Sequence, residues 1–501
     1  MADKLQPVRS FGRFDSGTCT VSSPTDIAQV SEVFEYARKS GQSVTIRGGG
    51  HSFDAQALHE GDSNTHVIMK TDAFEPKLIK FDPQRRDRVT LGCGVQWRQF
   101  VNEAIRHARE NNAPISLPGS IQTGGDTTVG GSLAGDCVSR SSGTLGKESR
   151  WIESFRILTP DSISVIDVSE ERNPDLFHAV IGGQGYIGFV TDITYKLTPL
   201  DRNLLRNESG IYRNLYAETK VSTHGSIGEL IQKQMELIHS EPSYPRGVSA
   251  EWFGGSAANP GRIHGAVCDS SFVEQRFPKR LGFPLYHDLQ SPLRYWTEVL
   301  VRYRFWSNLV DWLLYGFAKI GRKFEDPVED FLFFMDGDSA ARKEFERRNP
   351  PHLFPLVQQT FVVPKDKTES FTQNCIRKIH RQGLCPTESD MLYALEDECL
   401  LSANYRLNGF AVSFAFEQKG DFFGPRVFEL LRELSRDCLD AGGRIHLPKN
   451  SHVDREVCRL MFKGQIEKFE EIKRHYDRDL LLRNPFSDRL FDFKQAKRAS
   501  A

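Results

Sequence analysis

Apolar and polar positions near the start of the chain alternate in a way that predicts a helix, a buried strand and a loop. Residues 23–26 (Ser-Pro-Thr-Asp) combine a capping residue, a proline and an acid, which is typical of a helix start. One apolar helical face and a glycine stop follow at Ile27, Val30, Phe34, Ala37 and Gly41. A β-branched run at 44–46 then leads into three glycines. The pattern predicts a packed helix–strand unit that ends at a glycine loop.

Farther along, the pattern changes near residues 201 and 441. A strand is predicted at 192–197, and the middle region shows longer helices and aromatic strands. These strands are predicted at 331–335, 360–363 and 410–416, and an amphipathic helical tail extends through Tyr476. A chain of 501 residues is too long for a single core, so at least two domains are expected.

Composition and charge describe an ordinary globular protein. The net charge of −1 and the pI near 6.9 provide no footprint for nucleic acid or an anionic membrane. Nine cysteines without CxxC pairs favour a reduced compartment and predict neither a zinc site nor any other metal site. Residues 1–13 are polar, so no secretory signal is expected and the predicted location is the cytoplasm.

Four glycine-dense segments occur in series. The first follows the strand at 44–46 and reads Arg-Gly-Gly-Gly-His-Ser over 47–52; the others lie at 117–131, 141–146 and 181–191. Glycines let a loop approach a ligand closely and turn its N–H groups toward a diphosphate. One such loop is weak evidence, since an isolated match is usually a turn beside a solvated histidine. Four in series indicate a nucleotide-type cofactor.

These segments resemble, in order and spacing, the FAD-binding segments of the vanillyl-alcohol oxidase family of PCMH-type FAD-binding oxidoreductases. Within that family, 331–336, 358–364 and 442–451 resemble the flavin subunit of decaprenylphosphoryl-ribose 2-epimerase, whereas 391–405 is more similar to alditol and aldonolactone oxidases. The resemblance implies an α+β, two-domain fold with an α+β substrate (cap) domain. It assigns residues 1–200 to the FAD-binding domain, 201–440 to the cap, and 441–501 to a segment that returns to the FAD domain.

The resemblance also implies the cofactor, FAD, bound covalently through the histidine of the first loop, His51. The cofactor-binding positions that it implies are His51, Arg47, Gly48, Gly49, Gly50, Ser52, Gly119, Ser120, Thr123, Gly124, Gly125, Thr128, Val129, Gly131, Ser132, Gly135, Gly185, Gly188 and Val190. Asp126 stands where bicovalent relatives carry cysteine, so no second link is expected. Cys137 is expected to be a buried structural thiol. Val138 stands where close relatives often carry a histidine, so any base at that position is missing.

Four residues are candidates for catalysis. Lys449 matches a lysine near the flavin and substrate in the family, where an ammonium suits charge stabilisation; on residue type alone it would be an exposed lysine in a turn. Glu396 matches a substrate-binding glutamate of alditol oxidase, although 396–398 fits a solvated acidic turn equally well. Tyr405 and Ser413 are weaker pocket candidates, because such residues on strands are often plain core.

The family implies oxidation of a C–OH group of a sugar, polyol, sugar lactone or nucleoside by hydride transfer to flavin N5. Electrons would then pass to O₂ or another acceptor. Two alternatives stay open: the flavin subunit of a two-step sugar epimerisation, and a flavin-binding protein without catalysis. Arg302, Arg304 and Asp311 interrupt the aromatic stretch 295–317, which therefore cannot span a bilayer. The stretch is either a pair of amphipathic helices that cover the substrate domain, or an interfacial membrane anchor or lid over an apolar substrate. The oligomeric state is not indicated.

Overall fold

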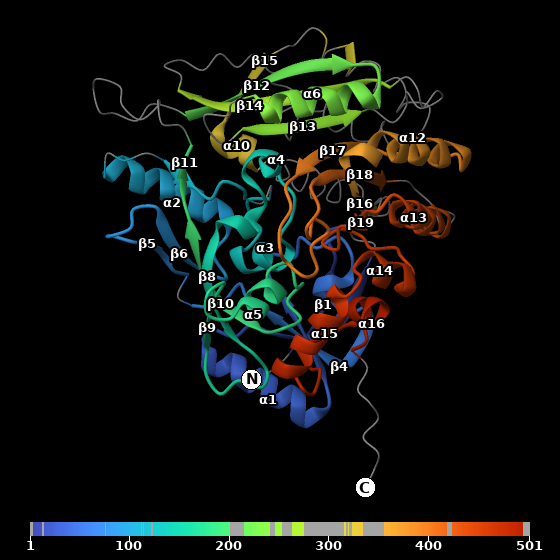
Figure 1. The fold of residues 1–501 in the computed structure, drawn as a ribbon. Coiled ribbons are helices and arrows are strands. Elements are labelled where there is room, and N and C mark those ends of the chain that lie inside the picture. Colours follow the sequence, from blue (N-terminus) through green and yellow to red (C-terminus); the bar gives the residue numbers. More distant parts are fainter. Residues whose placement is uncertain are drawn as a thin grey trace.

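A computed structural model gives the fold of this chain (Figure 1). It describes residues 4–12, 15–75, 77–111, 113, 115–121, 124–200, 215–240, 246–252, 263–274, 315–316, 319, 323–333, 355–417 and 423–493. Two sheets built from the N-terminal part lie together in the lower part of the view, and a large sheet lies above them (Figure 1). Helices and sheets are mixed throughout, as an α+β fold requires.

The first sheet has four strands in the order β1-β2-β4-β3, with β2, β3 and β4 parallel to one another. Its strands are β1 (Lys4–Arg9), β2 (Ser16–Ser22), β3 (Ser43–Arg47) and β4 (Gly61–Lys70), and the short 3-10 helix η1 (Ala55–Ala57) follows β3. Helix α1 (Ile27–Ser40) packs on β3 and β4. The sheet confirms the predicted helix–strand unit.

The start of α1 differs in detail from the prediction. The N-cap is Asp26, whose carboxylate accepts a hydrogen bond from the Gln29 N–H at 2.9 Å, so Ser23 lies outside the helix. Ile27 is 37% exposed, because it occupies the first helical position, whereas Val30, Phe34 and Ala37 are buried. Gly41 ends the helix with a φ of 68°, as the sequence predicted.

A five-stranded antiparallel sheet in the order β5-β6-β10-β8-β9 lies beside the first. Its strands are β5 (Ile79–Phe81), β6 (Arg88–Gly92), β8 (Ile152–Leu158), β9 (Ile166–Ser169) and β10 (Phe189–Lys196). The helices of this region are α2 (Trp97–Glu110), α3 (Val129–Gly135), α4 (Ser142–Leu145), η2 (Glu148–Trp151) and α5 (Pro174–Val180), and β7 (Ser116–Leu117) pairs with β11 (Thr198–Pro199). Strand β10 confirms the strand predicted at 192–197.

The upper sheet is antiparallel and has eight strands in the order β15-β12-β14-β13-β17-β18-β16-β19. These are β12 (Leu215–His224), β13 (Gly247–Trp252), β14 (Gly265–Glu274), β15 (Lys323–Pro327), β16 (Leu356–Pro364), β17 (Glu388–Ala394), β18 (Gly409–Glu417) and β19 (Arg444–Ile445). Helices α6 (Ile227–His239), α12 (Lys365–Arg381) and α13 (Phe423–Asp440) contact this sheet, and α12 also contacts the other two helices.

The aromatic strands predicted for this region are partly confirmed. Strands β16 and β18 contain the predicted segments 360–363 and 410–416. The strand predicted at 331–335 is wrong at its start, because Phe331 and Leu332 end helix α10 (Val328–Leu332); residues 334–335 lie outside the described part. Short apolar runs cannot distinguish a strand from a buried helix end.

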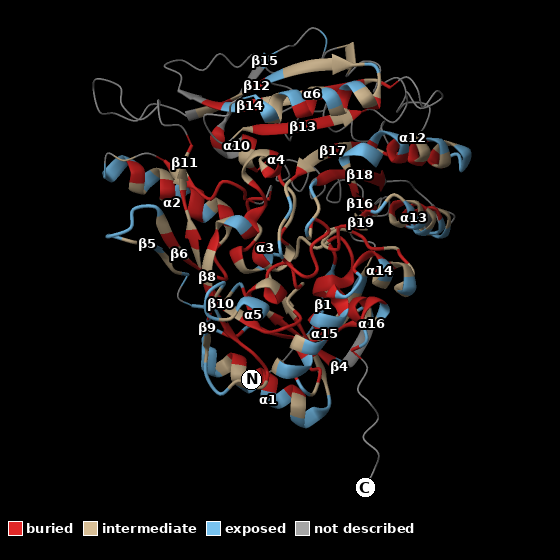
Figure 2. Cartoon of the chain, viewed as in Figure 1, coloured by how far each residue is buried: buried red, intermediate tan, exposed pale blue. Residues whose placement is uncertain are grey.

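The C-terminal segment extends from the upper sheet to the N-terminal one. After β19 it forms α14 (Arg455–Met461), α15 (Gln465–Tyr476) and α16 (Pro485–Leu490). Leu482 forms a parallel bridge with Val44 of β3, and Asn484 donates hydrogen bonds to the carbonyls of Ala55 and Gln56. The buried residues run continuously from the C-terminal helices into both lower sheets (Figure 2).

Two further expectations concern membranes and cysteines. In the described ranges, no helix is both long and apolar enough to cross a membrane. Of the segment 295–317, only residues 315 and 316 lie within the described residues, so its role as a lid or covering helix pair is not addressed. All nine cysteines are described, and no disulfide joins any of them.

Candidate active site

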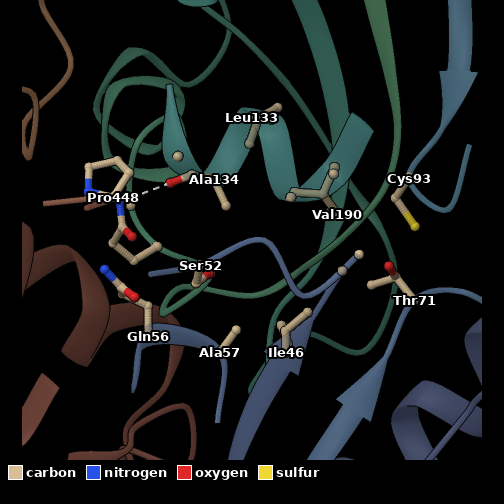
Figure 3. A pocket seen from close by; sticks show the side chains of 18 of the residues that line it. Ile46, Ser52, Gln56, Ala57, Thr71, Cys93, Leu133, Ala134, Val190 and Pro448 are labelled. Carbon is tan, nitrogen blue, oxygen red and sulfur yellow. Dashed lines mark hydrogen bonds between the residues drawn. The ribbon is translucent and has the colours of Figure 1, made fainter. Parts of the chain in front are cut away.

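Three of the four glycine segments line one cavity, whose empty space, open in part to solvent, is about 1040 Å³; the segment 141–146 does not line it. Helix α3 lies along one side with Leu133 and Ala134, and Ile46, Ser52 and Ala57 lie on the opposite side (Figure 3). Thr71 and Cys93 close one end, and Pro448 from the C-terminal segment lies at the other (Figure 3). The fourth glycine segment completes the wall with residues 183–188. The cavity thus extends from Thr71 and Cys93 at one end to Pro448 at the other, as a site for an extended ligand requires.

The first loop begins where β3 ends. Gly50 has a φ of 76°, a left-handed conformation that favours glycine, and it turns the chain toward His51. Gly49 is needed for a second reason: a Cβ there would lie 2.5 Å from the Asp126 carbonyl of the second loop. Arg47 points away from the cavity and donates to the carbonyls of Ala57 and Arg9 at 3.0 and 2.9 Å. The first two glycine loops are thus packed directly against each other.

The cavity wall is suited to FAD. It combines bare glycine backbone, which can face a diphosphate, with aliphatic side chains that suit a flat apolar ring. The predicted cofactor residues that line it are Gly48, Gly49, Gly50, His51, Ser52, Gly131, Gly135, Gly185, Gly188 and Val190. These residues come from three of the predicted segments, which supports the argument from several loops rather than one.

The other predicted cofactor residues do not line this cavity. Thr128 caps α3 and accepts from the Gly131 N–H at 3.3 Å, Val129 is core, and Ser132 donates to the buried Glu148. Ser120 pairs with Ser139, and a Cβ on Gly119 would meet the Trp151 ring. Of the remaining four, Arg47, Gly124 and Gly125 lie beside the first loop without lining the cavity. The fourth, Thr123, is outside the described residues. Glycine-dense sequence marks both the loops that face the cavity and the loops that support them.

His51 is half-buried at the cavity wall. Its ring stacks on Phe11 with centroids 5.5 Å apart and an interplanar angle of 24°. A Cβ on Gly124 would lie 3.5 Å from the His51 Nδ1, so the second loop also restricts the ring. The imidazole is therefore held between the N-terminal segment and the second loop, at the edge of the space that FAD would fill.

A second cavity of about 790 Å³ lies against the eight-stranded sheet. Four neighbouring strands supply alternate residues to it, as expected for one face of a sheet. These residues are Ser249 and Glu251 of β13, Glu388, Asp390 and Leu392 of β17, Ala411 and Ser413 of β18, and Gln358 and Thr360 of β16. Arg140, His446 and Lys449 complete the charged part of the wall. Cys137 lines both cavities, so the two meet there.

Lys449 belongs to this second cavity. Burial is the main cause that lowers the pKa of its ammonium, against which Cys137, Asp390 and Glu388 act. The Nζ lies 3.9 Å from the centroid of the Phe53 ring, a cation–π contact. The backbone of its loop is fixed because the Gln56 side chain donates to the carbonyls of Leu447 and Lys449, both at 2.8 Å. Lys449 is a positioned cation rather than a mobile surface lysine.

Asp390 and His446 have shifted proton affinities. Burial raises the pKa of Asp390 to about 6, against the lowering effects of a hydrogen bond with Ser413 and of the Lys449 charge. His446 is 4% exposed, and burial lowers its pKa well below the usual value, so its imidazole is neutral near pH 7. The cavity therefore holds a carboxyl that changes charge close to neutral pH.

The structure does not bring Glu396 and Tyr405 to either cavity. Glu396 is exposed, and Glu398 pairs on the surface with Arg406 at 3.0 Å. Between them, Asp397 turns inward and pairs with the buried Lys147 at 2.9 Å. Tyr405 packs against the core at the base of the same loop, under the Arg406 guanidinium. The acidic stretch 396–398 is thus an anchored surface turn, and it leaves Lys449 and Ser413 as the predicted catalytic residues found in the second cavity.

The two residues Cys137 and Val138, which follow α3, both line a cavity. Cys137 is half-buried where the cavities meet, rather than enclosed in the core as predicted, because the chain leaves the helix there and follows the cavity wall. Val138 lines the second cavity and cannot exchange a proton. Any proton acceptor in the second cavity must therefore come from another element.

Several lining residues were missed from the sequence. In the FAD-type cavity they include Gln56, Thr71 and Cys93, which lie in ordinary sequence with no local signal, and Tyr186 and Pro448, which lie inside the segments 181–191 and 442–451 but were not singled out. In the second cavity the missed residues are mainly polar: Arg140, Ser249, Glu251, Gln358, Thr360, Glu388, Asp390 and His446. A usable signal existed only in β13, where Ser249 and Glu251 alternate with apolar residues; in β16 and β17 the polar residues are consecutive, at 358–360 and 388–390.

Comparison with known proteins agrees with the FAD-type cavity. Residues 20–165 match the family described as FAD binding domain. The chain is 24% identical to decaprenylphosphoryl-beta-D-ribose oxidase of Mycolicibacterium smegmatis over 483 residues, which covers 92% of each protein. It is 25% identical to cytokinin dehydrogenase 1 of Arabidopsis thaliana over 197 residues, 38% of this chain and 32% of the relative. It is also 31% identical to the FAD-linked oxidoreductase fogF of Aspergillus ruber over 36% of this chain and 33% of that relative.

The matched region 20–165 contains the first two glycine loops and helix α3. The match to the oxidase extends beyond it, through the eight-stranded sheet and Lys449, because it covers nearly the whole chain. The family resemblance predicted from the glycine segments is confirmed: residues 20–165 match an FAD binding domain, and the chain is similar to decaprenylphosphoryl-beta-D-ribose oxidase over nearly its whole length.

Proposed function

We propose that this protein is an FAD-dependent oxidoreductase that oxidises a C–OH group of a small polyhydroxylated molecule: a sugar, polyol, sugar lactone or nucleoside. The observation that carries the proposal is the junction of two cavities. The glycine-walled cavity suits FAD, and the polar cavity that holds Lys449 borders it at Cys137. A substrate in the polar cavity would lie next to the cofactor.

Bound FAD would supply the hydride acceptor at N5. The chain's own residues would orient the substrate and stabilise charge. Carboxylates and hydroxyls along β13, β17, β18 and β16 can accept or donate hydrogen bonds to several substrate hydroxyls. The Lys449 ammonium is preorganised by Gln56 and Phe53 to offset the negative charge that develops on reduction.

We further propose that His51 forms a covalent bond to the 8α-methyl of FAD. The position of the imidazole supports this, since it lines the FAD-type cavity and is held by Phe11. A fixed ring needs little reorganisation to attack. The proposed location of the protein is the cytoplasm, and O₂ or a second electron carrier would reoxidise the flavin.

The same experiment also tests one alternative function. The full-length similarity to decaprenylphosphoryl-beta-D-ribose oxidase favours a role as the oxidising half of a two-step epimerisation. In that role the enzyme would oxidise a hydroxyl that a reductase partner then restores. A role without catalysis is disfavoured by the polar cavity, because a protein that only stores FAD needs no half-buried Lys449 and Asp390 in a cavity beside the cofactor.

The test is an anaerobic screen of the purified, FAD-loaded protein. Neutral polyols, sugars, sugar lactones, nucleosides and a phosphorylated sugar are each mixed with it, and the flavin absorbance is followed. Loss of absorbance with one class identifies the donor; readmitting air, or adding an artificial electron acceptor, then separates oxidase from dehydrogenase behaviour. If no member of any class bleaches the flavin, the proposed function is wrong.

A further inference from the structure

A row of four polar residues crosses the eight-stranded sheet at the second cavity. Glu251 of β13 pairs with Asp390 of β17, Asp390 with Ser413 of β18, and Ser413 with Thr360 of β16. Directly opposed residues in antiparallel strands have Cβ atoms about 4.5–5.5 Å apart. All four side chains line the cavity, and Asp390 occupies one of the two central positions of the row.

Asp390 is fixed by its neighbours in this row. The hydroxyls of Ser413 and Thr360 lie 2.9 Å apart, and Ser413 also hydrogen-bonds to the Asp390 carboxylate. A hydroxyl can donate one hydrogen bond while it accepts another, so Ser413 can hold the carboxylate with Thr360 as its own donor. Because Ser413 donates to only one carboxylate oxygen of Asp390, the other oxygen is available to a ligand. A short side chain on a central strand also loses little entropy on being held.

The charged groups around Asp390 come from every element that borders the cavity. Lys449 and Arg140 face it with positive charge, Glu251 and Glu388 with negative charge, and the buried His446 is neutral. Burial and Glu251 raise the pKa of Asp390, and the Ser413 hydrogen bond and the two cations oppose them, which leaves it at about 6. At pH 7 the group is therefore mostly a carboxylate that can bind a proton.

The cavity offers few other proton acceptors. Val138 has none, His446 is enclosed with its pKa far below the usual value, and Lys449 must lose a proton before it can accept one. Glu388 is exposed at the rim. Glu251 is the remaining acid, and it lies one strand farther from Lys449 and from the junction at Cys137.

We propose that Asp390 is the catalytic base that removes the proton of the substrate hydroxyl, an inference that rests on the proposed function. In this step the substrate O–H bond breaks and its proton binds a carboxylate oxygen of Asp390. A hydride leaves the same carbon for the flavin, and a carbonyl forms. The substrate loses two electrons that the flavin gains, and Asp390 then releases its proton to solvent.

The test uses the FAD-loaded protein and the alcohol that reduces it fastest in the screen. Anaerobic flavin reduction is measured between pH 4.5 and 9 by stopped flow. The wild-type rate should rise through about pH 6, because Asp390 must be ionised. Asp390→Asn should lower the rate by roughly 10²–10⁴-fold and abolish this rise, whereas Asp390→Glu should restore part of both.

Two comparison variants separate the base from its surroundings. Ser413→Ala removes a hydrogen bond that lowers the pKa of Asp390, so the rise should move to higher pH with the carboxylate still present. Glu388→Gln changes an acid on the same strand and in the same cavity, and should keep a rise near pH 6. If Asp390→Asn does not bind FAD, the Ser413→Ala shift and the Asp390→Glu profile decide the question.

A second readout needs no turnover. Infrared titration of the FAD-loaded protein without substrate should show one carboxyl that ionises near pH 6 and that is missing in Asp390→Asn. A normal rate and pH profile in Asp390→Asn, or an Asp390 carboxyl that ionises below about pH 4, would overturn the inference while flavin bleaching by the alcohol upholds the proposed function. If no alcohol bleaches the wild-type flavin, the proposed function fails and the assignment of Asp390 as its base fails with it, whatever the infrared titration shows.

Discussion

The Lys449 ammonium lies 3.9 Å from the centroid of the Phe53 ring, and this contact joins two distant segments of the chain. Phe53 follows the first glycine loop, two residues after His51, whereas Lys449 follows β19 of the eight-stranded sheet. Asp54 strengthens the same junction by accepting from the Ser451 N–H at 3.2 Å and from Arg489 at 2.8 Å. The predicted flavin anchor and the predicted catalytic lysine are therefore positioned by one set of contacts.

Lys449→Ala should slow flavin reduction by roughly 10²–10³-fold, because one preorganised charge contact is lost. The fold and bound FAD should be retained, since the backbone of the loop is held by Gln56. Anaerobic stopped flow measures the rate, and the resting flavin spectrum checks cofactor binding. Lys463→Ala, at an exposed position after α14, is the control. A normal rate in Lys449→Ala would remove this residue from the mechanism.

Phe53→Leu tests the contact itself. It keeps an apolar side chain but removes the ring face, so Lys449 loses a cation–π interaction of about 0.5–2 kcal/mol. If the full amount is lost from the transition state, flavin reduction should slow by roughly two- to thirty-fold. In a Lys449→Ala background the same change should have no further effect on the rate. An equal effect in both backgrounds would show that Phe53 acts through packing instead.

The covalent bond is tested by acid precipitation. Washed wild-type protein should stay yellow, and proteolysis should yield a flavin peptide that contains His51. His51→Ala should bind FAD through the remaining glycine walls but release it all into the acid supernatant. Flavin that leaves wild-type protein on acid treatment would contradict the covalent bond without contradicting FAD binding.

The stretch 23–52 was predictable because its signals are local. The face of α1, the Gly41 stop and the glycine loop can each be found within a few residues of sequence. The acidic wall was not predictable in this way, because Glu251, Asp390 and Thr360 come together only through strand pairing. Glu396 shows the opposite error: a run of acids resembled a binding site, yet its one inward carboxylate, at Asp397, is used by Lys147.

Glu396→Gln should therefore leave both the rate of flavin reduction and its pH dependence unchanged. The side chain is exposed, and the loop keeps its shape through the backbone N–H of Glu396, which donates to Asn408, and through Lys147. Stopped flow with the best alcohol compares this variant with Glu388→Gln in the second cavity. A large rate loss in Glu396→Gln would restore the role that its sequence position predicted.

Glu148 provides a prediction about stability and pH. Burial raises its pKa to about 8, although Ser132 and Tyr195 both donate hydrogen bonds to its carboxyl group. The folded state therefore binds a proton that the unfolded chain has released above its ordinary pKa of 4.5. The stability that this proton contributes is complete below about pH 4.5 and is lost as the pH rises to about 8, by at most about 1.4 kcal/mol per pH unit.

Glu148→Gln removes this titration but keeps a neutral side chain of the same length. Relative to wild type, the variant should be progressively more stable as the pH rises from 4.5 to 8, and the difference should level off at higher pH. Thermal unfolding of both FAD-loaded proteins across this range measures the difference in midpoint. Glu429→Gln, at an exposed position of helix α13, is the control, and its difference in midpoint from wild type should stay constant with pH. A constant difference for Glu148→Gln as well would mean that Glu148 is ionised in the folded core, with its charge carried by the Ser132 and Tyr195 hydroxyls.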